Sequence, residues 1–333
     1  MKKNTKLFII LGVLVIIAFL ITLIQTKGTI KRELKDFAID DTSVVNKIFM
    51  ANKENQFVTL EKIEGEWIVN QKYKAQKEKV NLLLETMQRV KISSPVANSA
   101  LETIIKSLAT RSVKVEIYQK DKLAKTYYVG DATPDNLGTF MLLEGSSRPF
   151  ITYIPGFRGF LTQRFFLSEI EWRDRTIFNY RFNEIHSVSV EKPSKPEQSF
   201  RAINNGDNSF SLESLSDNKP VENFDTMKVK MYIGYFKKVA FDSFVTKMDP
   251  VKKDSILQSQ PDYIITVEKA DQTSKKLTTY IKPGINLLDG TGGTFEYDVD
   301  YQYAFMDADT STILLIQYFV FDPIFKEKKD FFK

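Results

Sequence analysis

The longest hydrophobic stretch of the chain lies close to its N-terminus. Residues Leu7–Ile24 form an 18-residue run without a charged side chain, in which Thr22 is the only polar residue. As a helix this run spans roughly 27 Å, close to the hydrocarbon thickness of a bilayer, about 30 Å. A cleaved signal peptide has a shorter apolar segment and then small residues, whereas Gln25-Thr26-Lys27 follows here. The pattern therefore predicts an uncleaved membrane anchor over residues 1–27, followed by a linker over residues 28–43.

Residues 44–157 combine strand and helix patterns. The turn Glu64-Gly65-Glu66 predicts a hairpin, and two helices are expected after it. The first has apolar residues at helical spacing from Val80 to Val90. The second follows Ser99-Ala100-Leu101-Glu102, which has the pattern of a capping box. The predicted strands cover residues 44–50, 57–60, 67–69, 113–118, 125–129, 139–143 and 150–154.

Residues 185–333 repeat this order of elements. A first helix is expected over residues 224–241, with Asn223 or Asp225 as its cap. Asp249-Pro250 is expected to open the second helix, because an acceptor at N-cap and a proline at N1 are both favoured there. The predicted strands cover residues 185–190, 199–203, 210–212, 263–268, 276–281, 294–297, 301–306 and 312–321.

The two segments have the same element order at an offset of about 145–150 residues. We therefore predict an α+β fold in which an N-terminal transmembrane helix precedes two tandem β-rich pseudo-repeats. Each pseudo-repeat has a hairpin, two helices and antiparallel strands. The alternative is a chance similarity between two unrelated α+β domains. Residues 158–184 are expected to form a connecting helix and junction, whose Phe-rich face packs on one or both sheets.

Charge changes the interpretation of the chain in two ways. Lys2, Lys3 and Lys6 precede the anchor, which favours a cytoplasmic N-terminus and an extracytoplasmic body. Residues 1–27 hold four lysines, and removing them from the 47 basic residues leaves 43 against 42 acidic ones. The net charge of +5 therefore belongs mostly to the anchor, and a nucleic-acid-binding body is not expected.

Candidate chemistry is sparse. The chain has no cysteine, which excludes disulfides, thiol nucleophiles and cysteine-based metal sites. His186 is the only histidine, and a strand histidine that shares the face of Val188 and Val190 is a better interpretation than a catalytic one. No spacing selects a pair of carboxylates for hydrolysis. We therefore predict no catalytic residue, no cofactor and no metal ligand.

For three other segments we weigh a binding function against a purely structural one. Asp298, Asp300, Asp307 and Asp309 provide oxygen ligands for calcium but lack the spacing of an EF-hand, and Asp307–Thr310 is expected to be a turn. Gly290-Thr291-Gly292-Gly293 is expected to be a hairpin loop rather than a phosphate-binding loop. The tail, residues 322–333, either touches a membrane or partner or frays with its aromatic residues partly packed on the body.

Several motifs carry a resemblance to a known family. They are Gly65-x-Trp67-x-Val69, Tyr128-Val129-Gly130 and Trp172-Arg173-Asp174-Arg175-x-Ile177-Phe178, together with the helix pair. Over about residues 40–320 the chain resembles an uncharacterised, domain-of-unknown-function family of membrane-anchored bacterial proteins. Genes of that family often lie beside those of gliding- or secretion-type ABC transporters. The resemblance implies a helper role in an envelope complex and supplies no catalytic residues.

The sequence favours two functions. The first is a non-enzymatic accessory or scaffold subunit, held in the bacterial inner membrane by Leu7–Ile24 beside an integral-membrane partner such as a transporter. The second is an extracytoplasmic module that binds a peptide, glycan or lipid in a cleft between the repeats. A hydrolase ranks last, and no small-molecule substrate can be named.

Overall fold

Alternating buried and exposed side chains form strands, which are the commonest regular secondary structure of the described chain. The computed structural model describes residues 35–284 and 293–332. The predicted anchor and nearly all of the glycine-rich run at 290–293 lie outside these residues. Within them, no helix is long and apolar enough to cross a membrane. The chain divides into two compact units, unit 1 ending at Asp174 and unit 2 beginning at Arg175.

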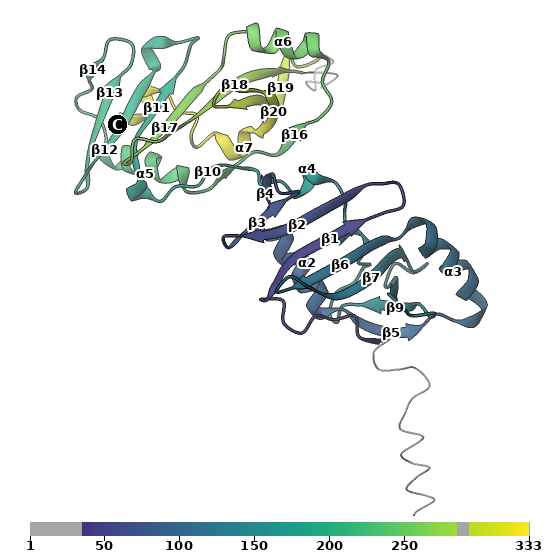
Figure 1. Ribbon diagram of the computed structural model, residues 1–333. Coiled ribbons are helices and arrows are strands. Elements are labelled where there is room, and N and C mark those ends of the chain that lie inside the picture. Colours follow the sequence, from purple (N-terminus) through teal and green to yellow (C-terminus); the bar gives the residue numbers. More distant parts are fainter. Residues whose placement is uncertain (1–34, 285–292, 333) are drawn as a thin grey trace, which may run out of the picture. The chain divides into compact units, whose positions relative to one another are not determined.

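Unit 1 is built on a nine-stranded antiparallel sheet (Figure 1). Its strand order is β4-β3-β2-β1-β6-β7-β8-β9-β5. The strands are β1 (Val45–Ala51), β2 (Phe57–Ile63), β3 (Glu66–Val69), β4 (Tyr73–Lys74), β5 (Lys91–Pro95), β6 (Val113–Gln119), β7 (Lys122–Ala132), β8 (Thr139–Leu143) and β9 (Phe150–Tyr153). The helical elements are α2 (Lys77–Arg89), α3 (Asn98–Arg111), η2 (Thr162–Arg164) and α4 (Glu169–Trp172).

Unit 2 has a second nine-stranded antiparallel sheet, in the order β14-β13-β12-β11-β17-β18-β19-β20-β16. The strands are β11 (Ile185–Glu191), β12 (Phe200–Gly206), β13 (Ser209–Ser214), β14 (Lys219–Pro220), β16 (Ser243–Val245), β17 (Ile264–Lys269), β18 (Ser274–Pro283), β19 (Tyr297–Met306) and β20 (Asp309–Gln317). Two short strands, β10 (Thr176–Phe178) and β15 (Val239–Ala240), pair separately. The helical elements are η3 (Phe182–Glu184), η4 (Pro196–Gln198), α5 (Thr226–Gly234), η5 (Tyr235–Lys237), α6 (Pro250–Gln258), α7 (Tyr318–Phe321) and η6 (Lys328–Phe331).

The two sheets have the same strand order when corresponding elements are compared, β1 with β11, β6 with β17 and β5 with β16. The predicted α+β class with antiparallel sheets is therefore confirmed. The hairpin turn at Gly65 is also confirmed, because β2 pairs with β3 and Gly65 adopts a φ of 86°. This left-handed backbone conformation favours glycine.

One face of each sheet is covered along its length, and the other only in part. In unit 1, α2 and the segment containing α4 contribute Val80, Leu83 and Trp172 to the main core. Helix α3 covers the opposite face over β7 and β8 (Figure 1). Gly130 permits this close packing, since a Cβ there would lie 2.6 Å from Cδ2 of Leu108 on α3.

Unit 2 follows the same layering. Helix α5 packs into the main core with Val229, Tyr232 and Ile233. Helix α6 covers part of the opposite face, where Ile256 joins a smaller cluster with Tyr280, Tyr303, Phe305 and Ile313. Each sheet therefore has one half-face, over β1, β2 and β6 or over β11, β12 and β17, that lies outside these clusters.

Both predicted aspartate caps in unit 2 are confirmed, but the serine cap in unit 1 is wrong. Asp225 accepts hydrogen bonds from two backbone N–H groups at the start of α5, and Asp249 does the same for α6. Helix α3 instead begins at Asn98, after Ala97, and no side chain caps it. The capping box at Ser99 fails because Ser99 already lies inside the helix.

Other boundaries also differ from the prediction. The helix expected over residues 224–241 ends earlier, as α5 and η5, before β15. The strand expected over 294–297 does not form separately, since β19 is one strand that starts at Tyr297. The strand expected over 312–321 ends at Gln317, where the chain turns into α7. In the predicted connecting region, the only helical elements before Asp174 are the short η2 and α4.

Candidate functional site

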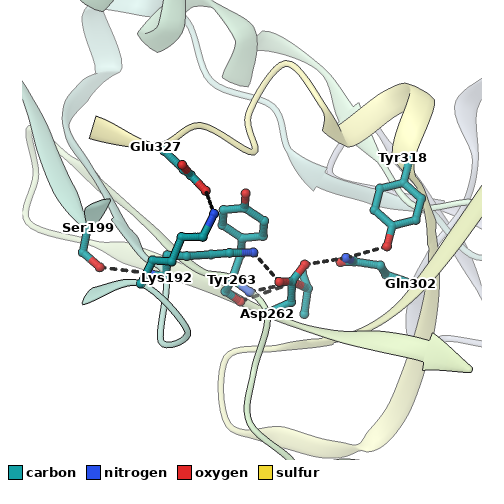
Figure 2. A network of polar contacts seen from close by, with 9 residues as sticks. Lys192, Ser199, Asp262, Tyr263, Gln302, Tyr318 and Glu327 are labelled. Atoms are coloured by element: carbon teal, nitrogen blue, oxygen red, sulfur yellow. Dashed lines mark hydrogen bonds and ion pairs between the residues drawn. The ribbon is translucent and has the colours of Figure 1, made fainter. Parts of the chain in front are cut away.

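A polar network in unit 2 gathers side chains from the ends of several elements (Figure 2). Lys192 directly follows β11, and Asp262 lies two residues before β17. The Lys192 ammonium donates to Oδ1 of Asp262, and the side chains of both residues are 12% exposed. The same ammonium lies over the ring of Tyr263, 3.7 Å from its centroid. The lysine is therefore held by a carboxylate and an aromatic face together.

Gln302 and Tyr318 extend the network on the far side of Asp262 (Figure 2). Nε2 of Gln302 donates to Oδ2 of Asp262 at 2.6 Å and to the hydroxyl of Tyr318 at 2.9 Å. Burial raises the pKa of both Tyr263 and Tyr318, and the Asp262 carboxylate adds to that rise. Oε1 of Gln302 is buried without a partner among the described residues.

The C-terminal segment closes over this network. The ring of Phe325 stacks on Tyr263 with centroids 4.5 Å apart and planes 3° apart. Glu327 accepts from Lys195 at 3.3 Å. Since Tyr318 belongs to the same segment, three of its side chains contact the body here. Both carboxylate oxygens of Asp262 already have donors, so the network is arranged to fasten this segment rather than to present a reactive group.

A surface cavity adjoins the network through Lys192 and Ser199. Its volume is about 490 Å³, and it opens on the half-face of the unit 2 sheet that α6 leaves uncovered. The lining is rich in hydroxyl groups: Ser189, Ser199, Ser216 and Thr266. Nε of Arg201 donates to Ser189 at 2.9 Å. Such a lining can hydrogen-bond a small polar group, but its two cations already have partners.

The corresponding half-face of unit 1 is aromatic. Side chains of β1, β2 and β6 that point away from the core alternate with buried neighbours such as Ile48 and Met50. The rings of Phe49 and Phe57 lie 6.2 Å apart, and Phe57 is 58% exposed. We call this surface the aromatic half-face; its members are Lys47, Phe49, Phe57, Thr59, Glu61, Lys114, Glu116 and Tyr118.

Ion pairs surround these rings. Lys47 contacts Glu61 at 3.3 Å and lies over the ring of Tyr118 at 5.7 Å from its centroid. Glu116 accepts from Lys114 at 2.7 Å and from the Tyr118 hydroxyl at 2.8 Å. Burial acts to raise the pKa of Glu116, but these two donors outweigh it and the pKa lies below its ordinary value. The charges are thus fixed in place around an apolar centre.

The residues considered for chemistry in the sequence do not converge. His186 is exposed, whereas Val188 and Val190 are buried. The expectation that all three share a face is wrong, because a bulge between Ile185 and Ser187 shifts the register against β17. The tail does not fray: Ile324 and Phe331 are buried in the unit 2 core.

Three of the four aspartates, Asp298, Asp307 and Asp309, accept hydrogen bonds from neighbouring groups. Asp298 accepts from Lys282 and from the backbone N–H groups of Asp300 and Tyr301. Asp307 lies in the turn between β19 and β20, as expected, with a φ of 52°. Within residues 35–284 and 293–332, no three His, Cys, Asp or Glu side chains gather as metal ligands would.

Trp172, Gly130 and Trp67, from the motifs that carry the family resemblance, pack inside unit 1. Trp172 is fully buried, stacks on Phe166 at 4.1 Å and donates its indole N–H to the Phe166 carbonyl at 3.0 Å. The Trp172 carbonyl in turn accepts from the backbone N–H of Gln76, one residue before α2. Gly130 lies beneath α3, and Trp67 is buried in the same core.

A comparison with protein families matches residues 67–278, more than half of the chain, to a family described as "Domain of unknown function (DUF4340)". The expected relation to an uncharacterised domain family is therefore confirmed. No curated protein and no solved structure matches the chain.

Proposed function

We propose that this chain, which belongs to the DUF4340 family, is a non-enzymatic, membrane-anchored accessory or scaffold subunit of an envelope complex. In this proposal Leu7–Ile24 crosses the bacterial inner membrane and both units lie outside the cytoplasm. The partner is an integral membrane protein, with gliding- or secretion-type ABC transporters as the class that the family resemblance implies. The two units are tandem copies of one structural unit, which their common strand order supports.

The observation that carries this proposal is the aromatic half-face of unit 1. Phe49, Phe57 and Tyr118 lie on the same side of strands whose other side packs into the core of unit 1. Exposed aromatic clusters with a charged rim are typical of protein interfaces, where aromatic residues are enriched and supply much of the binding energy. A rigid sheet also presents them without the entropic cost of ordering a loop.

The contrast with unit 2 supports this role for unit 1. On the same side of the corresponding strands β11, β12 and β17, unit 2 has Ser189, Arg201 and Thr266 instead of aromatic rings. Helix α6 and the tyrosine-rich cluster cover the remainder of that face. An anchored unit 1 would meet its partner in two dimensions, so even a weak contact would be occupied because tethering raises the effective concentration.

The test is site-specific photo-crosslinking of the full-length chain in intact membranes. A photo-reactive residue at Phe57 is expected to form an adduct with an integral membrane protein. The matched control is Leu82, which is 43% exposed on α2, on the helix-covered side of the same sheet. Adducts at Phe57 but not at Leu82 support the proposal. Equal adducts at both positions, or none at Phe57, contradict it.

Location is tested separately with single-cysteine variants, because the chain has no cysteine of its own. The cells are treated so that the outer membrane is permeable and the inner membrane stays intact. A membrane-impermeant thiol reagent should then label Leu82→Cys without lysis. Labelling only after lysis would place unit 1 in the cytoplasm and overturn the predicted orientation, even if the partner contact is real.

A further inference from the structure

Helix α5 of unit 2 carries apolar side chains on both of its sides. Val229, Tyr232 and Ile233 are buried in the core. On the opposite side, Met227 and Met231 of α5 and Tyr235, the first residue of η5, follow one another at intervals of four residues. They are 60%, 56% and 42% exposed, respectively. A surface helix normally places polar residues on its outer side, so this α5 stripe (Met227, Met231 and Tyr235) requires an explanation.

Lysines lie near the stripe. Lys228 and Lys326 line the same hollow as Met231 and Tyr235, and Lys230, Lys237 and Lys238 are close to it in the sequence. Lys228 donates to the backbone carbonyl of Asp330 at 3.2 Å, and Lys230 to the side-chain oxygen of Asn208 at 3.0 Å. These acceptors are neutral, so the bonds leave both ammonium charges uncompensated.

Two carboxylates near the stripe accept hydrogen bonds from backbone N–H groups. Asp225 accepts from the N–H groups of Met227 and Lys228, and Asp330 accepts from that of Glu327. Helix α5 itself contains two lysines and no acidic residue. These carboxylates keep their charge but are outnumbered, since residues 225–238 hold four lysines and one acidic residue. The surface around the stripe therefore carries a surplus of positive charge, and its occupant should be anionic.

The residue types distinguish lipid from protein as that occupant. Lys47 and Lys114 of the aromatic half-face pair with Glu61 and Glu116. Lys228 and Lys230 bond instead to neutral acceptors, so their charges are available to lipid phosphates. An interfacial membrane helix combines an apolar strip with basic side chains that reach the headgroups. Tyrosine suits the same depth, since its ring is apolar and its hydroxyl remains hydrated.

We infer that the α5 stripe and its lysines dock unit 2 on a membrane surface that contains anionic phospholipid. The apolar side chains enter the boundary between headgroups and acyl chains, and the lysines contact lipid phosphates. This contact depends neither on the predicted anchor nor on the protein partner proposed for unit 1.

The experiment uses the full-length chain with a single cysteine at Met231, labelled with an environment-sensitive fluorophore. The protein is reconstituted with vesicles of phosphatidylcholine alone or mixed with phosphatidylglycerol. Docking is expected to shift the emission to the blue and to shield the label from an aqueous quencher, only with the anionic lipid. Salt at about 1 M, where the Debye length is about 3 Å, should reverse both effects.

The control position is Val251 on α6, which is 78% exposed and has no apolar stripe beside it in the helix. Lys230→Gln and Lys237→Gln should each weaken docking roughly fivefold, the value for one basic residue near an anionic surface. Circular dichroism checks that each variant is folded.

Three results would overturn the inference. They are an unresponsive label at Met231, a response equal to that at Val251, and a response equal in both kinds of vesicle. A shift that appears only when an acidic protein is added would also overturn it, and would assign the stripe to a protein instead.

Discussion

The C-terminal segment should contribute to the stability of unit 2 through one side chain close to the chain end. Phe331 is 2% exposed, and its ring lies 4.7 Å from that of Phe200 and 5.4 Å from that of Tyr232. Its carbonyl also accepts from the N–H of Asp225, the cap of α5. Phe331→Ala removes the ring and leaves this backbone contact available.

The expected loss of unfolding free energy is about 3 kcal/mol. Truncating a buried phenylalanine costs about 3–5 kcal/mol, which includes the cavity left behind. We expect the low end of this range, because η6, which contains Phe331, is a single short turn that can shift to fill part of the gap. Phe319→Ala is the matched control in the same segment, since Phe319 is 89% exposed. Its substitution should change stability by less than about 0.5 kcal/mol.

Urea denaturation of the full chain can separate the two units. Both tryptophans, Trp67 and Trp172, belong to unit 1, so their fluorescence follows that unit, whereas far-UV circular dichroism follows both. With a urea m-value of about 1–3 kcal/mol/M, Phe331→Ala should lower the unit 2 midpoint by about 1 M or more. The tryptophan transition should not move. A shift no larger than that of Phe319→Ala would refute the reasoning.

Three further substitutions test other parts of the fold. Gly130→Ala places a Cβ 2.6 Å from Cδ2 of Leu108, so urea denaturation should show a loss of about 1–3 kcal/mol. The double variant Gly130→Ala/Leu108→Ala should lose less unfolding free energy than the sum of the losses in the two single variants. Asp249→Ala removes the α6 cap and should cost about 1 kcal/mol, measured as faster amide exchange confined to the first turn of that helix. Burial acts to raise the pKa of Asp298, but the Lys282 ammonium and two backbone N–H donors outweigh it, so the pKa lies below its ordinary value. Ionised Asp298 therefore stabilises the fold above about pH 3.9, and this contribution is lost as the pH falls through the lowered pKa. Asp298→Asn should lower the Tm at pH 7, and the difference from the parent should close on acidification.

Local chemistry made much of the fold predictable. Residues Thr139–Leu143 form β8 with the expected bounds because small and charged residues interrupt the apolar alternation on both sides. Asp249 was identifiable as a cap because Pro250 follows it, whereas the sequence left Asn223 and Asp225 as alternatives and the structure selects Asp225. The same rule failed at Ser99, where an equally good acceptor lies one residue inside α3. Spacing alone does not distinguish these cases.

Register and long-range polar contacts were not predictable. His186 points away from Val188 because of one bulge, which no local pattern of β11 indicates. The Lys192, Asp262 and Gln302 network joins residues up to 110 positions apart, brought together by strand order. No spacing rule applies to such a set. The aromatic half-face had a signal that was overlooked, since Phe57 alternates with core residues at a period of two.

The common strand order separates what the fold requires from what it leaves free. Buried positions must be apolar in both units, whereas exposed positions on corresponding elements can differ at little cost to stability. The helices α2 and α5 both cover the core face of their sheets, yet α2 exposes Glu85 and Arg89 as an ion pair, and α5 exposes Met227 and Met231. For the exposed sheet faces, unit 1 has the more apolar surface: this face is aromatic in unit 1 and hydroxyl-rich in unit 2. Packing imposes neither difference, so each surface is free to serve the contact proposed for it, a protein on the unit 1 sheet and an anionic lipid surface on the unit 2 helix.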